Sequence, residues 1–408
     1  MRIVIVGAGV AGCVIARGLS RLPGMDIHCL ERVEPGDHAE AGTGLNIGPN
    51  AVKALRIQDP ELAGIIDDAA FEWTNWRISL TDGTVLFDLP LDDVASENGW
   101  RLRWSELYRV LRESAEGLIT YGCRIADMGA TPEGAGKTWI RWSDSEGDHE
   151  LTDVDLLIAV DGRFSQTRQT FAGGVNSRQI GVAIFRTLVP DTSDGLITDY
   201  QQWFNGPNRL LAYRVPEDHI YIAGTFPIPL DMETPDEMKT AEALRAAYTP
   251  VSGYASGQAR WLIDTVCAPE SELHWARIQE SEARYRETGA NVLYLGDSSN
   301  GMVPTLGQGA TQAIEGACAA LGEIERLAGD GNFDAGDWLA AIEAVRADRT
   351  RFVMEFSLEA SDTLLAGSDP VEGTRKKRNP AFQEKLKRLY NDIGTIGAVH
   401  SREESAVG

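Results

Sequence analysis

A glycine-rich turn near the start of this 408-residue chain constrains its fold more than any other feature. Residues 7–12 read GAGVAG and stand between a β-branched run (3–6) and an apolar helical pattern (10–22). The first glycine of such a motif permits a tight turn, the second lets the backbone approach a pyrophosphate, and the third lets helix and strand pack closely. The free N–H groups at the start of the helix favour phosphate. The segment therefore predicts a strand–turn–helix unit that binds a dinucleotide.

An acidic residue follows this unit where a ribose would need it. Residues 27–30 have the pattern of a second strand, and Glu31 ends it, about 20 residues after the last glycine. A carboxylate at this place accepts hydrogen bonds from ribose hydroxyls and repels a 2′-phosphate. The segment alone therefore favours FAD or NAD over NADP as the bound dinucleotide.

The overall charge limits the partners. The chain has 38 Lys and Arg against 61 Asp and Glu, a net charge of -23, which disfavours nucleic acid and anionic membranes. No apolar stretch reaches the ~20 residues that a membrane span needs. The five cysteines are scattered, which argues against disulfides or a metal site and for a cytoplasmic location. The one basic run, residues 375–378, favours a solvated linker over a nuclear address.

Further along the chain the pattern alternates between buried strands and half-buried ones. Two apolar runs have the pattern of buried parallel strands: 156–160 and 292–295. Apolar and polar residues alternate, as in an antiparallel sheet, in four others: 73–89, 200–204, 210–215 and 220–226. Helical patterns cover 334–365 and 381–393, and 401–408 predict a disordered tail. The predicted fold class is α/β: a Rossmann-like domain with an inserted antiparallel β-sheet domain and C-terminal helices. The expected boundaries are 1–72, 101–175 and 276–330 for the nucleotide domain, 73–100 and 176–275 for the substrate domain, and 331–408 for the C-terminal region.

Two later pairs of glycine and aspartate identify a family resemblance. Asp161-Gly162 opens the run DGRFSQTR, and Gly296-Asp297 runs into PTLGQGATQAIE at 304–315. With these motifs, most of residues 1–365 resembles the group A flavoprotein hydroxylases, the single-component FAD-dependent aromatic monooxygenases of the para-hydroxybenzoate hydroxylase fold. An Asp at a strand end can hydrogen-bond a ribityl or ribose hydroxyl. The glycine loop at 307–309 opens a helix whose N–H groups can stabilise negative charge on a reduced flavin.

The resemblance implies an enzyme with FAD as resident cofactor and NADH or NADPH as transient reductant. In this family a flavin C4a-hydroperoxide formed with O2 transfers OH to a small phenolic or N-heteroaromatic, hydroxypyridine-like ring. The expected partners are that aromatic substrate and O2, and a homodimer is compatible with the sequence. The alternatives are a flavin-dependent halogenase or reductase on the same scaffold, or a non-catalytic binding protein with an FAD-type fold.

The resemblance also implies a set of FAD-binding positions. Relatives have an arginine that reaches FAD where this chain has Trp104, so Arg103 is the substitute we predict, with Arg101 as the other candidate. The full predicted set is Gly7, Gly9, Ala11, Gly12, Glu31, Arg32, Arg103, Ile125, Asp161, Gly296, Asp297, Pro304, Gly307, Gln308, Gly309 and Ala310.

The ring site is expected where the inserted sheet faces the flavin. Asn46 and Pro304 are predicted beside the flavin ring, and Tyr213 is predicted to relay a proton or orient a phenol. Arg186 can hold a carboxylate through two parallel hydrogen bonds. The predicted catalytic residues are Tyr213, Asn46 and Pro304, and the predicted substrate-binding residues are Arg186, Trp203, Tyr213 and Asn300, with no metal.

Overall fold

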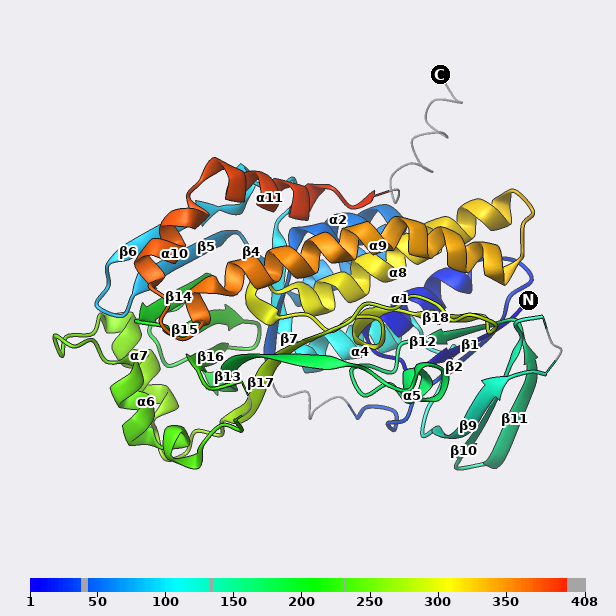
Figure 1. Ribbon diagram of the computed structural model, residues 1–408, viewed down its shortest axis with the longest axis horizontal. Coiled ribbons are helices and arrows are strands. Elements are labelled where there is room, and N and C mark those ends of the chain that lie inside the picture. Colours follow the sequence, from blue (N-terminus) through cyan, green and yellow to red (C-terminus); the bar gives the residue numbers. More distant parts are fainter. Residues whose placement is uncertain (38–42, 133–134, 231, 395–408) are drawn as a thin grey trace, which may run out of the picture.

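The chain is described by a computed structural model that covers residues 1–37, 43–132, 135–230 and 232–394. The predicted disordered tail, 401–408, lies outside these described residues. Within them the chain forms a five-stranded parallel sheet, a seven-stranded mixed sheet and two three-stranded sheets (Figure 1). None of the helices in these ranges combines the length and apolarity needed to cross a membrane.

The parallel sheet begins at the N-terminus and has the strand order β18-β12-β1-β2-β8. Its strands are β1 (Arg2–Val6), β2 (Asp26–Leu30), β8 (Ile119–Thr120), β12 (Leu156–Ala159) and β18 (Val292–Tyr294). Alternate side chains of β1 lie on opposite faces of the sheet: Ile3 and Ile5 pack against helices, while Val4 and Val6 pack against a separate three-stranded sheet. That sheet contains β9 (Arg124–Ala130), β10 (Thr138–Asp144) and β11 (Gly147–Val154). The predicted Rossmann-like unit is therefore confirmed.

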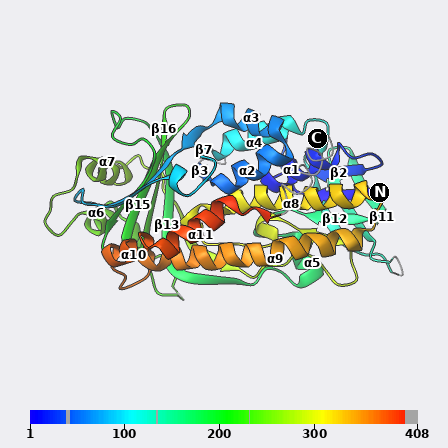
Figure 2. The same cartoon turned by 90° about the horizontal axis from the view of Figure 1, so that it is seen from above.

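Helices cover the other side of the parallel sheet. They are α1 (Val10–Leu19), α2 (Pro49–Gln58), α3 (Pro60–Ala69), α4 (Trp104–Ser114) and α8 (Gln308–Gly329), with α5 (Gln166–Ala172) following β12. The long α9 (Ala335–Glu359) lies beside α8 in both views (Figures 1 and 2). All of these helices except α5 share one large hydrophobic core with the sheet, whereas Phe171 of α5 packs on the side of the three-stranded sheet.

The seven-stranded sheet has the order β17-β13-β16-β15-β14-β5-β6. Its strands are β5 (Asn75–Leu80), β6 (Val85–Pro90), β13 (Ser177–Pro190), β14 (Tyr200–Asn205), β15 (Asn208–Val215), β16 (His219–Pro227) and β17 (His274–Ser281). The predicted antiparallel pairing holds for five ladders, but β14 and β5 pair in parallel. A parallel pair needs a long connection, which is present because the two strands come from different inserts.

The two faces of this sheet have different neighbours. One face packs on α6 (Ala241–Tyr248) and α7 (Gly257–Val266), and the other faces the C-terminal helices and the candidate site. A small sheet of β3 (Gly44–Ile47), β7 (Gly99–Arg103) and β4 (Phe71–Trp73) lies between the two large sheets. We keep the domain boundaries given above as a proposal and note that β17 continues the large sheet to Ser281.

The C-terminal region differs from the sequence-based expectation in two places. The predicted helix over 334–365 ends at Glu359 and continues as a 3-10 turn, Ala360–Leu364. The basic run is not a solvated linker, because it lies at the end of α10 (Pro370–Lys377), where Lys377 is buried and 3.3 Å from the Asp362 carboxylate. The following helix, α11 (Pro380–Asn391), matches the predicted one closely.

Candidate functional site

The three glycines of the N-terminal loop have different surroundings. Gly7 has a φ of +104°, and a Cβ there would lie 2.7 Å from the carbonyl oxygen of Val160. A Cβ on Gly12 would lie 2.0 Å from the carbonyl oxygen of Gly7, whereas one on Gly9 would meet no atom within 4 Å. The fold itself therefore requires Gly7 and Gly12, and the space at Gly9 is open for the phosphates of a ligand.

Glu31 is held in a fixed orientation at the end of β2. Its carboxylate accepts hydrogen bonds from the backbone N–H of Ala8 (2.6 Å) and of Val33 (3.1 Å). The guanidinium of Arg112, from α4, lies 3.9 Å from the same carboxylate. This arrangement fixes the acidic group beside the glycine loop, where the ribose of a dinucleotide would lie.

A stripe on α4 extends from the glycine loop toward the large sheet. Trp104 and Tyr108 have ring centroids 5.5 Å apart, and the Arg112 guanidinium lies 5.2 Å from the Tyr108 centroid. Arg112 also donates to the carbonyl oxygen of Ala8 at 3.3 Å. Sequence reasoning missed Tyr108 and Arg112. Trp104, Tyr108 and Arg112 are spaced by four residues, which is the spacing that places side chains on one face of a helix.

The other predicted arginines have different roles. Arg101 donates to the carbonyl oxygens of Glu72, Thr198 and Arg214, which ties the small sheet to the large one. Arg103 pairs with the carboxylate of Glu217. Neither residue lines the cavity described below, whereas Trp104 does.

Asp161 has a divided role. One carboxylate oxygen accepts from the N–H and the hydroxyl of Thr167, at 2.9 and 3.0 Å, and so caps α5. The other oxygen is buried and has no hydrogen-bond partner among the described residues. Asp161 therefore supports the first turn of α5 and keeps one acceptor oxygen that no described residue uses.

Gly296 and Asp297 lie where two helices meet the end of β18. Gly296, with a φ of +61°, lies close to the side chains of Ala11 and Ala313, so a small residue is needed there. Asp297 lines the cavity and is exposed there. Neighbouring protein atoms raise the pKa of its carboxyl by desolvation, and the nearby Arg163 partly opposes this shift. Such a carboxylate is suited to accept hydrogen bonds from ligand hydroxyls.

The loop that starts α8 is held by side chains from its neighbours. The Gly48 N–H donates to the Thr311 hydroxyl at 2.8 Å, and the Asn50 amide donates to the Gln308 side chain at 3.1 Å. A Cβ on Gly309 would meet no atom within 4 Å, and this residue borders open space. The N-terminal end of a 22-residue helix is directed at that space and favours negative charge.

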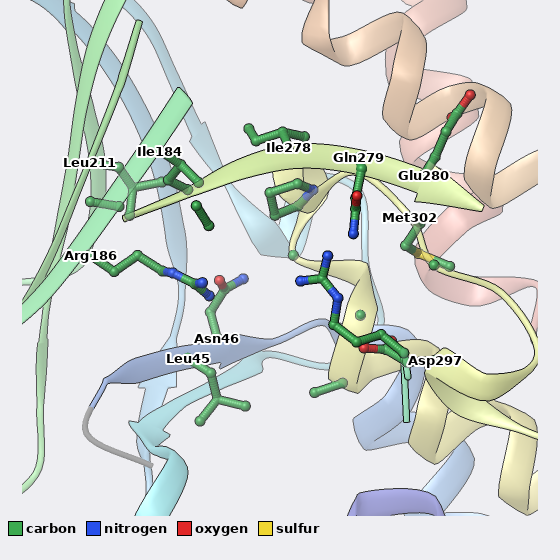
Figure 3. A pocket seen from close by; sticks show the side chains of 18 of the residues that line it. Leu45, Asn46, Ile184, Arg186, Leu211, Ile278, Gln279, Glu280, Asp297 and Met302 are labelled. Atoms are coloured by element: carbon green, nitrogen blue, oxygen red, sulfur yellow. The ribbon is translucent and has the colours of Figure 1, made fainter. Parts of the chain in front are cut away.

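These loops and the large sheet enclose a cavity of about 270 Å³ (Figure 3). The cofactor-side loops contribute Asn46, Asp297, Pro304, Gly307 and Gly309 to its lining. The sheet side is rich in arginine and tyrosine and includes Arg186, Tyr200, Arg209, Tyr213 and Tyr221. Figure 3 shows the Arg186 and Asn46 side chains pointing toward each other across the cavity.

Three of the predicted ring-site side chains are therefore brought together with Pro304: Asn46, Arg186 and Tyr213. Two others are not. Trp203 is buried on the opposite face of the sheet among α6 and α7, because strand alternation places it there, and this position does not support a stacking role. Asn300 is buried and absent from the cavity lining.

The remaining predicted cofactor residues occupy varied positions. Arg32 is exposed beside Glu31, and Ala11 is buried in α1. Ile125 lies on β9, where its carbonyl oxygen accepts from Gln166 at 3.3 Å. Ala310 lines the cavity in the first turn of α8.

Comparisons with known proteins give the class to which this fold and site correspond. The chain is 26% identical over 399 residues to 3-amino-4-hydroxybenzoate 2-monooxygenase PtnB3 of Streptomyces platensis, covering 94% of this chain and 93% of that protein. It is 25% identical over 406 residues to an FAD-dependent urate hydroxylase of Mycolicibacterium vanbaalenii, covering 97% and 94%. Klebsiella pneumoniae HpxO, solved with FAD and uric acid, matches with a TM-score of 0.74 at 20% identity, covering 96% of this chain and 95% of that one. No family model matches the chain.

The chain thus has the fold of the group A flavin hydroxylases, and its relatives are FAD-dependent aromatic monooxygenases. The predicted resemblance and the predicted fold class are confirmed. The predictions of an oxidoreductase and of FAD as the cofactor of proteins of this kind are also confirmed. The halogenase, reductase and binding-protein alternatives are not favoured.

Proposed function

We propose that this chain binds FAD and uses NADH or NADPH and O2 to hydroxylate a small aromatic substrate. The observation that carries the proposal is the shared cavity: one side is formed by the loops that fit a flavin, and the other by arginine and tyrosine side chains of the sheet. Aromatic and cationic groups on one wall suit an aromatic ring with polar substituents. The proposal includes a cytoplasmic location, since all five cysteines are free and buried.

Several of the chain's own groups fit parts of FAD. The open space at Gly9 admits phosphates, and Glu31 is oriented for a ribose. The unpaired oxygen of Asp161 and the cavity-facing Asp297 supply acceptors for hydroxyls. When bound, FAD would take electrons from the nicotinamide and supply the activation of O2 for the hydroxylation.

The residues of the sheet would hold and orient the ring. Tyr213 and Tyr221 have ring centroids 4.9 Å apart and form one wall of the cavity. Burial raises the pKa of Tyr213 well above its usual value and that of Tyr221 to about 12. Both phenols therefore stay protonated at neutral pH, so Tyr213 would donate a hydrogen bond to a substrate oxygen rather than act as a base.

Asn46 and Pro304 would fix the position of the ring on the cofactor side. The Asn46 amide nitrogen is buried without a partner among the described residues and lies against Gly307, where a Cβ would be 2.4 Å from it. Pro304 is a cavity-lining residue without an N–H donor, and it begins the turn that leads into Gly307. Together they would hold the substrate close to the flavin position and exclude water from it.

The proposal is tested by measuring NADH and NADPH oxidation and O2 uptake across hydroxylated benzoates, pyridines and quinolones, with analysis of the products. We expect at least one of these aromatics to accelerate nicotinamide oxidation and to gain a hydroxyl group. Purified protein without bound FAD, or FAD-loaded protein that oxygenates none of the rings, would refute the proposed function.

A further inference from the structure

One face of α4 carries a stripe of two aromatic side chains and one cation: Trp104, Tyr108 and Arg112. The ring centroids of Trp104 and Tyr108 lie 5.5 Å apart at an interplanar angle of 33°, and the Arg112 guanidinium lies 5.2 Å from the Tyr108 centroid. The stripe spans two steps of four residues, which is about 12 Å along a helix axis. This length is comparable to that of the ribityl chain and pyrophosphate that join the two ends of FAD.

The ends of the stripe lie at the two ends of the candidate cofactor site. Trp104 lines the cavity together with Asp297, and its backbone N–H donates to the carbonyl oxygen of Thr43 at 3.0 Å. At the other end, Arg112 lies 3.9 Å from the Glu31 carboxylate, beside the glycine loop. The stripe therefore runs from the cavity to the carboxylate that is oriented for a ribose.

Tyr108 lies in the middle of this path. The electrostatic influence of Arg112, Asp297 and Glu31 reaches its phenol, which places the phenol between the two ends of the site. Burial raises the pKa of Tyr108, so its hydroxyl is protonated at neutral pH and can donate a hydrogen bond. None of the described residues accepts a hydrogen bond from this hydroxyl or from the indole N–H of Trp104. Because partly buried phenol and indole groups usually have a partner, both donors are available to a ligand.

The two rings belong to the cofactor side of the cavity. Trp104 and Tyr108 are half-buried and pack against the hydrophobic core of the helices and the parallel sheet. None of the described residues of the seven-stranded sheet belongs to that core. The exposed surfaces of the two rings therefore lie along the path from the cavity to the glycine loop, apart from the sheet side that Tyr213 and Tyr221 line.

We propose that Trp104 and Tyr108 contact the cofactor directly: the Trp104 indole packs against the flavin half of FAD, and the Tyr108 hydroxyl donates a hydrogen bond to its pyrophosphate. This inference rests on the proposed function, because it requires FAD in the site. The electron-rich face of an indole suits the electron-poor ring system of a flavin. A protonated phenol supplies a donor to an anionic phosphate, and hydrogen bonds to charged acceptors are the stronger ones.

The first test compares the fluorescence decay of bound FAD in wild type and in Trp104→Phe. An indole in contact with a photoexcited flavin quenches its emission by a reversible electron transfer, and phenylalanine is a much poorer electron donor. We expect a dark flavin in wild type and a brighter, longer-lived emission in Trp104→Phe. The Kd for FAD should change less than about 3-fold in this variant, because an aromatic ring is retained. Trp104→Leu should brighten the flavin and also weaken FAD binding roughly 3- to 10-fold.

The matched control for these variants is Trp100→Phe. Trp100 lies four residues earlier, but it is 2% exposed, and its indole N–H donates to Asp67 at 2.6 Å. It does not line the cavity, so the flavin should stay as dark as in wild type when Trp100 is replaced. The tyrosines of the sheet are the same in all of these variants, so a difference in emission isolates the contribution of Trp104.

The second test separates the hydroxyl of Tyr108 from its ring. Tyr108→Phe keeps the contact between the rings but removes the donor, so the Kd for FAD should rise roughly 10-fold or more while the flavin stays dark. Tyr254→Phe, at a position that is 66% exposed, is the control and should bind FAD like wild type. Titration of the apoproteins with FAD measures both.

A bound flavin that is bright in wild type, or that stays equally dark in Trp104→Phe and Trp104→Leu, would overturn the contact of Trp104. A Tyr108→Phe protein that binds FAD as tightly as wild type would overturn the contact of Tyr108 with the pyrophosphate. These outcomes are distinct from failure of the proposed function, which would appear as wild-type protein that binds no FAD or as FAD-loaded protein that oxygenates no aromatic compound.

Discussion

Two buried groups of charged residues in this protein differ in how their charges are balanced. Below the flavin-side loop, the fully buried Glu315 accepts from Arg346 at 2.7 Å and from Arg349 at 2.9 Å, and it also accepts from Asn50 at 2.6 Å. On the cavity face of the sheet, Arg209 has no partner among the described residues.

The difference separates groups that the fold uses from groups that it leaves for a ligand. The Glu315 cluster joins α8, α9 and α2, and Arg349 also donates to the carbonyl oxygen of Leu389 in α11. Such a cluster stabilises the architecture because each of its charged groups has hydrogen-bonded partners within the fold. An uncompensated buried charge destabilises the free protein and is explained by a partner that arrives later. The following predictions test that distinction.

The largest effect is expected at the compensated cluster. Glu315→Gln leaves Arg346 and Arg349 buried without their counter-charge, so the free energy of unfolding should fall by about 3–5 kcal/mol. Chemical denaturation measures this change. Glu355→Gln, on the exposed side of α9, is the control and should stay within about 0.5 kcal/mol of wild type. A Glu315 variant as stable as wild type would contradict the structural role.

The same cluster predicts a pH dependence. Burial alone would raise the pKa of the Glu315 carboxyl, but Arg349 and Arg346 hold it well below its usual value. A lowered folded-state pKa contributes stability that is present above the unfolded pKa of about 4.3 and is lost as the pH falls toward the folded one. The stability difference between wild type and Glu315→Gln should thus be constant from pH 7 to 5 and shrink below about pH 4. Denaturation curves at several pH values would show a contradiction if the difference shrank between pH 7 and 5.

The second effect concerns two arginines of one helix. Arg112 faces Glu31 and the glycine loop, whereas Arg109 is half-exposed and pairs with Glu106 at 2.9 Å. Because Arg112→Ala removes a charge-assisted contact next to the proposed cofactor position, we expect this variant to bind FAD roughly 10- to 100-fold more weakly. Arg109→Ala should change it less than about 2-fold. Titration of the apoprotein followed by flavin fluorescence measures both, and equal affinities of the two variants would count against a cofactor role for the α4 stripe.

The third effect separates two glycines of the same loop. Gly12→Ala forces a Cβ against the carbonyl oxygen of Gly7, which should reduce stability by about 1–3 kcal/mol or more. Gly9→Ala has room in the protein and should keep the Tm of the apoprotein while weakening FAD binding about 10-fold or more. A Gly9→Ala protein that binds FAD like wild type would show that the open space is not the phosphate position.

The smallest effect is expected at Thr225. Thr225→Val removes a buried hydroxyl without a partner among the described residues, so the ligand-free protein should be unchanged or more stable by up to about 1 kcal/mol. Chemical denaturation measures this change, and a loss of stability above about 1 kcal/mol would show that the hydroxyl has a partner in the fold.

The sequence was sufficient for those parts of the site that depend on local spacing. The glycine loop, Glu31, Asp161 and Gly296-Asp297 each follow a strand directly, so their positions at one edge of the parallel sheet could be predicted. The runs at 200–204, 210–215 and 220–226 were likewise predicted as strands and form β14, β15 and β16.

The features that depend on tertiary pairing could not be predicted. Arg209 lies in an alternating strand, where an arginine is usually solvated, and only the register of β15 with β16 shows that it is buried on the cavity face. Trp203 was assigned to the ring site because aromatic residues stack on rings, but the alternation of β14 places it on the far side. In both cases the face of the strand on which the side chain lies determined its surroundings.

The hydroxylase proposal is tested most directly by isotope incorporation. FAD-loaded protein is incubated with NADH or NADPH, ¹⁸O2 and the aromatic compound that most accelerates nicotinamide oxidation, and the product is analysed by mass spectrometry. We predict a ring-hydroxylated product that carries one ¹⁸O atom. A product without ¹⁸O, or nicotinamide oxidation that yields only hydrogen peroxide with every aromatic compound tested, would contradict the account.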